Sequence, residues 1–175
     1  MNGAGAPRAL LLIGAVGVGK TTTTDAIADE LEARSIPGAA LDLDWLRRAW
    51  PAPADDRFNS RLERAALHAV SAVHREAGAK VLVAAGVIEE RAERDGYRTA
   101  FGCPLTVVRL TAPRALVRSR LHRRHEGEPD GLSWHLERFD ELTAILDAAE
   151  VEDLTVSVGP DPRSTAQAVL SAVGI

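Results

Sequence analysis

Short apolar runs alternate with longer amphipathic segments along the chain. The apolar runs are bounded by turn residues and predict five strands, at RALLLI (8–13), AALDL (39–43), KVLVAA (80–85), LTVVRL (105–110) and LTVSV (154–158). Each run is followed by a helical pattern. Strands this continuously apolar need cover on both faces, and the connections are long enough for crossover helices. The pattern therefore predicts an α/β protein, with a five-stranded parallel sheet between two layers of helices.

Two segments carry the clearest helical periodicity. Segment 57–77 places one set of apolar positions on a common helical face: Leu62, Ala66, Ala69, Val70, Val73 and Ala77. Segment 136–149 does the same with another set: Leu136, Phe139, Leu142, Ile145, Leu146 and Ala149. An amphipathic helix packs its apolar face against the core, so both faces are expected to be buried.

The stretch GAVGVGKTTTT, residues 14–24, is poor in helix formers, yet the helical pattern DAIADELEAR follows it directly. Gly14, Gly19, Lys20 and Thr21 match the phosphate-loop motif G-x-x-x-x-G-K-[ST], between a predicted strand and a predicted helix. The glycines let the backbone turn tightly, so that N–H groups of the loop and of the helix start face an anion. A turn that binds nothing would not need the lysine. The motif therefore predicts a nucleoside triphosphate site.

Each position of this loop has an expected role. The backbone around the phosphates is formed by Gly14, Ala15, Val16, Gly17, Val18 and Gly19. Lys20 supplies a charge for the outer phosphates, and the Thr21 hydroxyl is a ligand for Mg²⁺. Thr22 adds a hydroxyl near the inner phosphates, whereas Thr23 and Thr24 are expected to pack.

Residues elsewhere argue against other nucleotide-binding classes. A dinucleotide fingerprint would need a third glycine where Thr22 stands. A GTP-binding switch would carry D-x-x-G and N-K-x-D elements, which the sequence lacks, so ATP is the expected nucleotide. A motor-type ATPase would end the third strand in an acidic pair, whereas this strand ends in Ala85 and Gly86. These differences favour a kinase.

The end of the second predicted strand supplies candidates for the acceptor side. AALDLDWLRRAW places Asp44 two residues after Asp42 and three before Arg47, which makes Asp44 and Arg47 neighbours if a helix begins there. Asp44 is the candidate base for an acceptor hydroxyl, or a ligand of Mg²⁺ through water. Asp42 and Arg47 are further candidates for acceptor binding. The alternative is structural, with Asp44 as an N-cap, Asp42 as a solvated strand end and Arg47 as a surface partner.

The order GxxGxGKTT, LDxDxxR and an AGAxVLVA strand resembles adenylylsulfate kinase and the wider group of small P-loop kinases that phosphorylate metabolites, antibiotics or polynucleotide ends. The resemblance covers roughly residues 9–124. It implies a P-loop kinase fold in which Asp44, with Arg47, is the acceptor-side base. It also implies that the turn VGPDPRST borders adenine, with Arg163 over the base. Where adenylylsulfate kinases carry an asparagine with paired arginines and a K-G-L-Y type lid, this chain has FNSRLERAAL and LHRRHEGEPDG.

The stretch VRSRLHRRHEGEPDG predicts a basic helix end, residues 118–125, that opens into a polar, glycine-containing loop. In a kinase, arginines of a lid neutralise the charge of the transferred phosphoryl group. Arg120 and Arg124 lie one helical turn apart for this role, and Arg118 and Arg123 are less favourably placed. We therefore expect an arginine-bearing lid at about 118–134, with a solvated helix face as the alternative.

The start of the 57–77 helix is expected to border the acceptor cleft. Arg57 and Arg61 would share a helical face there and bind an anionic acceptor. Asp55 or Asp56 would cap the helix. Only 4% of the residues are aromatic, so the three tryptophans, Trp45, Trp50 and Trp134, are conspicuous. They are expected either to line a pocket or to pack in the core.

Composition limits the partners. The net charge of -4 and the pI near 5.7 give no general attraction to nucleic acid or to an anionic membrane. A single cysteine, Cys103, excludes an internal disulfide, and no segment approaches the roughly 20 apolar residues of a membrane span. We expect a cytoplasmic protein with one P-loop kinase-like domain over residues 1–175.

These features predict an ATP- and Mg²⁺-dependent phosphotransferase that acts on the hydroxyl of a small-molecule acceptor. Lys20, Asp44, Arg120 and Arg124 are its expected catalytic residues, and Thr21 with Asp44 its expected metal ligands. An adenylylsulfate kinase proper is one alternative. A second alternative, from another class, is an ATP-binding regulatory protein with slow or no hydrolysis.

Overall fold

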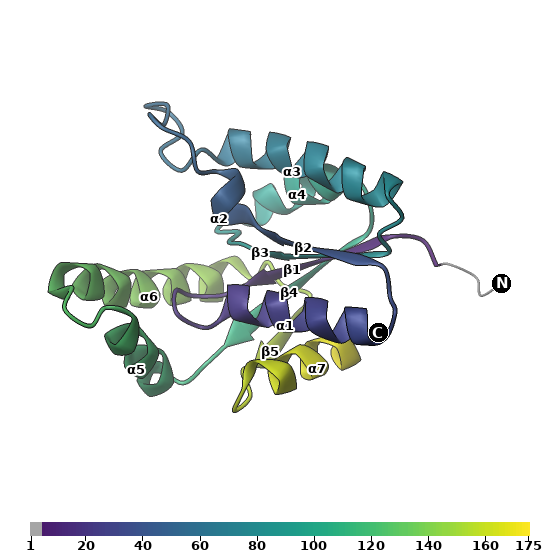
Figure 1. Cartoon of the computed structure of the whole chain (residues 1–175). Helices are drawn as coiled ribbons and strands as arrows, with labels where there is room; N and C mark the ends of the chain where they lie inside the picture. Colours follow the sequence, from purple (N-terminus) through teal and green to yellow (C-terminus); the bar gives the residue numbers. More distant parts are fainter. Residues whose placement is uncertain (1–4) are drawn as a thin grey trace.

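The computed structural model describes residues 5–175, apart from the side chain of Pro129, and its elements surround a central sheet (Figure 1). The five strands are β1 (Arg8–Ile13), β2 (Gly38–Asp42), β3 (Val81–Ala85), β4 (Leu105–Thr111) and β5 (Leu154–Ser157). All neighbouring pairs are parallel, in the order β2-β3-β1-β4-β5. The predicted five-stranded parallel sheet is therefore confirmed, and each strand lies within two residues of its expected place.

Helices cover both faces of this sheet (Figure 1). One layer contains α1 (Lys20–Ala33) and α7 (Pro162–Ala172), and the opposite layer contains α3 (Ser60–Glu76) and α4 (Arg94–Phe101). The helices α5 (Arg114–Arg124) and α6 (Pro129–Ala149) lie together at the end of the sheet where β1 leads into α1. Two short elements, α2 (Leu43–Leu46) and the 3-10 helix η1 (Arg91–Glu93), follow β2 and β3.

The central strand β1 shows why the apolar runs are continuous. Ala9, Leu11 and Ile13 point to the layer of α3 and α4, and Leu10 and Leu12 point to the layer of α1 and α7. All five side chains are completely buried. A strand covered on both faces needs apolar residues at every position, so its sequence loses the alternation of a half-exposed strand.

The helix α6 confirms the face expected for segment 136–149. Phe139, Leu142 and Leu146 are buried, and the first two pack with residues of α5 and of the loop after β1. The polar loop expected after α5 is shorter than the sequence suggested, because α6 already begins at Pro129. Proline suits the first turn of a helix, where its missing N–H group would have no partner.

The helix α3 contradicts the face expected for segment 57–77. It begins at Ser60 instead of Arg57, and it buries Glu63, Leu67 and Ser71. Leu62 and Val73, which belong to the expected core face, are 43% and 63% exposed. The reason is that polar contacts with α2 and α4, described below, hold the opposite face of the helix inward.

No helix among residues 5–175 is long and apolar enough to cross a membrane.

The orientation of α3 predicts different effects for two leucines on the same helix. Leu67→Ala removes a fully buried side chain, so we expect it to lower the free energy of unfolding by about 2–5 kcal/mol. Leu62→Ala truncates a side chain that is largely exposed, so we expect a change of only about 0.5 kcal/mol. Urea unfolding of both variants measures the difference. A larger loss for Leu62→Ala than for Leu67→Ala would show that the helix faces the other way.

Candidate active site

The phosphate-loop motif forms a tight loop between β1 and α1. Gly14, Gly17 and Gly19 have positive φ angles of 148°, 78° and 108°. At Gly14 the constraint is also steric, because a Cβ atom there would lie 2.6 Å from the backbone oxygen of Leu110. Only glycine combines this backbone conformation with so close an approach. The geometry of the loop itself therefore requires the glycine at position 14, independently of any ligand.

Lys20 lies across this loop. Its Nζ donates to the backbone oxygen of Gly14 at 2.9 Å and to that of Ala15 at 3.3 Å. Burial lowers the pKa of Lys20 to about 8, although the nearby charges of Asp44 and Asp42 act in the opposite direction. The ammonium group is thus held by neutral carbonyls in a site where an additional anion would favour its charged form.

Asp42 connects the loop to the acceptor side. Its Oδ2 accepts a hydrogen bond from the Thr21 hydroxyl at 2.9 Å, and its Oδ1 accepts one from the backbone N–H of Asp44 at 2.9 Å. Asp42 is therefore the N-cap of α2. The sequence hypotheses paired Thr21 with Asp44 as metal ligands or made Asp44 the cap. In the structure Asp42, not Asp44, contacts the Thr21 hydroxyl and caps α2.

Asp44, the second residue of α2, carries a largely exposed carboxylate. Its side chain is 81% exposed, and its Oδ1 lies 3.6 Å from Nε of Arg47, as the i, i+3 spacing predicted. The guanidinium of Arg47 turns away from solvent and pairs with Glu63. Arg47 is thus already bound to a carboxylate of the protein, whereas Asp44 offers its carboxylate to the cleft.

A pocket of about 610 Å³ brings these groups together with the expected lid. It is lined by loop residues 16–19, by Lys20, Thr21 and Thr22, and by Asp44. Arg120 and Arg124 of α5 line the same pocket, and Nη1 of Arg120 donates to the backbone oxygen of Val18 at 2.8 Å. Arg120 and Arg124, the two arginines expected in a lid, therefore share one cavity with the phosphate loop.

Three tryptophans are exposed instead of packed in the core. Trp45 and Trp50, on α2 and in the loop after it, are 69% and 84% exposed. Trp134 of α6 is 55% exposed and lines the pocket. The core-packing alternative is therefore wrong for all three.

The structure does not bring every expected residue to the pocket. Arg57 precedes α3, so it does not share a helical face with Arg61, and its guanidinium lies 5.4 Å from the ring centroid of Phe58. Arg61 pairs with Asp55 at 2.9 Å. Asp55 or Asp56 was expected to cap this helix: Asn59 occupies the N-cap position, and it is Asp56 that accepts from the N–H groups of Ser60 and Arg61 at 2.8 and 2.9 Å.

Arg163 also lies outside the residues that line the pocket. Its Nε donates to Glu30 of α1 at 2.7 Å. The part of the pocket that follows β5 is lined instead by Val158, Asp161, Pro162 and Thr165. The VGPDPRST turn thus reaches the cavity as the resemblance implied, but Arg163 points to Glu30.

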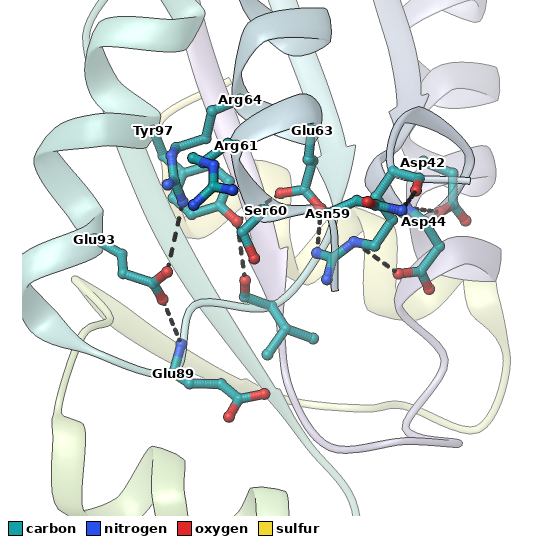
Figure 2. A network of polar contacts seen from close by, with 12 residues as sticks. Asp42, Asp44, Asn59, Ser60, Arg61, Glu63, Arg64, Glu89, Glu93 and Tyr97 are labelled. Carbon is teal, nitrogen blue, oxygen red and sulfur yellow. Dashed lines mark hydrogen bonds and ion pairs between the residues drawn. The ribbon is translucent and has the colours of Figure 1, made fainter. Parts of the chain in front are cut away.

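Sequence reasoning missed a buried polar network behind α2 (Figure 2). Glu63 is fully buried, pairs with Arg47, and accepts a hydrogen bond from the Tyr97 hydroxyl at 2.6 Å. Burial raises the pKa of Glu63. Burial and the neighbouring Glu63 raise the pKa of Tyr97. No local signal marks Glu63, because a glutamate between arginines on a helix is typical of a solvated face.

Comparison with known protein families matches residues 10–149 to the family described as AAA domain. The chain belongs to this AAA domain family. No curated protein sequence matches the chain significantly. The matched region begins in β1 and ends at the last residue of α6, so it contains the phosphate loop, α2, Arg120 and Arg124.

Solved structures resemble this AAA domain chain over nearly its full length. The tunicamycin resistance protein of Deinococcus radiodurans is 21% identical with a TM-score of 0.63, covering 98% of this chain and 97% of that one. A gluconokinase from Sinorhizobium meliloti is 22% identical with a TM-score of 0.60, covering 96% and 92%. An APS kinase from Mycobacterium tuberculosis, solved with AMPPNP and APS, is 19% identical with a TM-score of 0.57, covering 97% and 99%. The chain thus has the α/β P-loop kinase fold.

The lowered pKa of Lys20 predicts a pH-dependent stability. Between about pH 8 and the ordinary lysine pKa of 10.5, the unfolded chain holds the Lys20 proton and the folded chain loses it. Relative to Lys20→Met, the free energy of unfolding should therefore rise with pH in this window, by at most about 1.4 kcal/mol per pH unit. Chemical denaturation of both proteins without nucleotide measures this slope. Identical slopes for the two proteins would contradict the environment described for Lys20.

Proposed function

We propose that the protein is an ATP- and Mg²⁺-dependent kinase that transfers the terminal phosphoryl group to a hydroxyl of a small molecule. The observation that carries this proposal is the shared pocket. It holds the phosphate loop with Lys20, two arginines of α5, and the exposed carboxylate of Asp44. Phosphoryl transfer needs these parts: a phosphate-binding loop, cations for the transferred charge, and a group that accepts a proton.

On the donor side, the loop amides and the N-terminus of α1 would bind the phosphates. Lys20 would exchange the carbonyl oxygens of Gly14 and Ala15 for phosphate oxygens, and this gain of an anionic partner would restore the pKa that burial lowers. The Arg120 guanidinium, now on the carbonyl of Val18, lies where it could contact the transferred phosphoryl group.

The oxygens of Thr21 and Asp42 fit a magnesium ion. A hydroxyl and a carboxylate already lie 2.9 Å apart next to the loop, and Mg²⁺ bound to nucleotide usually takes only one or two protein oxygens. When bound there, the ion would neutralise and orient phosphate charge. This assignment replaces the expected pair of Thr21 and Asp44 and leaves Asp44 for the acceptor.

On the acceptor side, Asp44 would accept the proton of the attacking hydroxyl as its oxygen bonds to the terminal phosphorus. The bond between that phosphorus and the bridging oxygen breaks, and ADP leaves. The exposure of Asp44 supports this role, because the carboxylate stands at the edge of the pocket that Lys20 also lines. Catalysis of this kind depends mainly on positioning and on charge neutralisation.

The acceptor differs among proteins of this fold, which include a gluconokinase and an APS kinase. For an adenylylsulfate kinase proper we expected arginines on the acceptor side. Here Arg47 pairs with Glu63, and Arg61 pairs with Asp55. The geometry therefore favours a kinase for a less anionic acceptor.

The test of this function is acceptor-dependent ADP release from ATP and Mg²⁺, measured over a panel of metabolite alcohols that includes adenylylsulfate. We expect at least one alcohol to raise ADP release above the rate with water. Asp44→Asn should retain ATP binding in calorimetry and lose transfer to that alcohol, because the amide cannot accept the proton. ATP binding without any acceptor-dependent ADP release would instead support a nucleotide-binding regulatory protein.

A second variant tests the place of the metal ion. Asp42→Asn keeps an oxygen that can cap α2 but removes the charge next to Thr21. We expect nucleotide binding to require a higher Mg²⁺ concentration for its half-maximal effect in calorimetry, with the helical content in circular dichroism unchanged. The same substitution at Asp44 is the matched control and should leave the Mg²⁺ dependence of nucleotide binding as it is. An effect on Mg²⁺ confined to Asp44→Asn would return the metal site to Asp44.

A further inference from the structure

The buried face of α3 is polar where it meets α2. Asn59, immediately before the helix, and Glu63, one turn later, are 7% and 0% exposed. Each of them contacts the segment that carries Asp44. The nearby apolar side chains Phe58 and Leu62 are directed to solvent instead. A helix start that buries two polar side chains and exposes its apolar ones requires a specific explanation.

Asn59 holds the end of α2 through the backbone. Its Nδ2 donates to the carbonyl oxygen of Arg47 at 2.9 Å and to that of Ala49 at 2.8 Å. These carbonyls belong to residues that follow α2, and the carbonyl of Arg47 also accepts from the backbone N–H of Ala49 at 2.8 Å. The side chain of Asn59, at the N-cap of α3, therefore holds the backbone that leaves α2, the helix that carries Asp44.

Glu63 holds α2 through the side chain of Arg47. It pairs with the guanidinium of Arg47, whose Nε lies 3.6 Å from Asp44. On its other side Glu63 accepts from the Tyr97 hydroxyl of α4, which also lies 3.4 Å from the backbone oxygen of Val87 (Figure 2). An unbroken series of contacts thus runs from α4 to Glu63, to Arg47 and to Asp44.

We propose that Asn59, Glu63 and Tyr97 are positioning residues, which fix the carboxylate of Asp44 by holding α2 and Arg47. The proposal rests on the proposed role of Asp44 in phosphoryl transfer. The helix α2 has only four residues, too few to be stable without tertiary contacts. The cap from Asp42 holds its first turn, and the contacts from α3 hold its end.

The energetics support a positioning role over simple stabilisation. A buried ion pair adds little net stability, because removing both charges from water offsets their attraction. An apolar side chain at position 63 could fill the same space at less cost. What Glu63 adds is a directional contact with Arg47, and a displacement of about 1 Å at a reacting group can lower a rate about 100-fold.

Three variants separate positioning from a general effect on folding. Glu63→Gln keeps the size of the side chain and can still accept from Tyr97, but it cannot form the ion pair. Tyr97→Phe keeps the ring and removes only the hydroxyl. The matched control is Ser71→Ala, which alters a buried polar residue two turns along the same face of α3, whose hydroxyl has no hydrogen-bond partner within residues 5–175.

The first measurement follows α2 itself and needs no substrate. The chain has three tryptophans, so Trp50→Phe with Trp134→Phe leaves Trp45, next to Asp44, as the only tryptophan, which can be excited selectively over the single tyrosine. In this background we expect Glu63→Gln and Tyr97→Phe to lower the fluorescence anisotropy of Trp45, and Ser71→Ala to leave it unchanged. Equal anisotropy in all of these proteins would overturn the proposal.

The second measurement is ADP release from ATP and Mg²⁺, with water as acceptor and with the alcohol found in the panel. We expect Glu63→Gln to lower kcat about 10- to 100-fold without changing the KM for ATP. In an Asp44→Asn background it should have no further effect, because residues that act through one group are not additive. An equal loss in both backgrounds would overturn the proposal. If the parent protein releases no ADP at all, the proposed function fails, whereas the anisotropy still decides whether α3 holds α2.

Discussion

The arrangement of the site depends on the two hydrogen bonds that the carboxylate of Asp42 accepts. One of its oxygens accepts from the hydroxyl of Thr21 at the end of the phosphate loop, and the other accepts from the N–H of Asp44, the second residue of α2. A single side chain thereby sets the distance between the donor loop and the helix that carries Asp44. The strand β2 runs parallel to β1, with β3 between them, and ends at Asp42, so this carboxylate lies at the same edge of the sheet as the loop that leaves β1.

The polar contacts behind α2 explain why α3 packs as it does. A helix normally turns its apolar stripe to the core, and this one has such a stripe in sequence. Burying Glu63 and Asn59 instead satisfies the carbonyls at the end of α2 and the guanidinium of Arg47. Leu67 still reaches the core between these polar residues, so the helix keeps one apolar anchor while its exposed side carries Leu62 and Val73.

Local pattern predicted the parts of the fold that local chemistry determines. The five strands, the loop at Gly14 to Thr21 and the buried face of α6 all follow from runs and periods within one segment. The face of α3 could not be predicted, because it depends on Arg47 and Tyr97, which come from other segments. For the same reason the sequence placed Asp42, Asp44 and Thr21 near one another but could not tell which carboxylate meets the threonine.

The carbonyl oxygens of the phosphate loop compete with any bound anion for the charged groups of Lys20 and Arg120. Lys20 and Arg120 each bind carbonyl oxygens of residues 14–18, so an arriving anion must displace bonds that the loop already makes. An ion with a single charge exchanges these bonds for little gain, whereas a chain of phosphates engages both cations together. We therefore expect the charge density of a ligand to decide its binding here, because only a ligand with several negative charges can draw Lys20 and Arg120 from these carbonyls together.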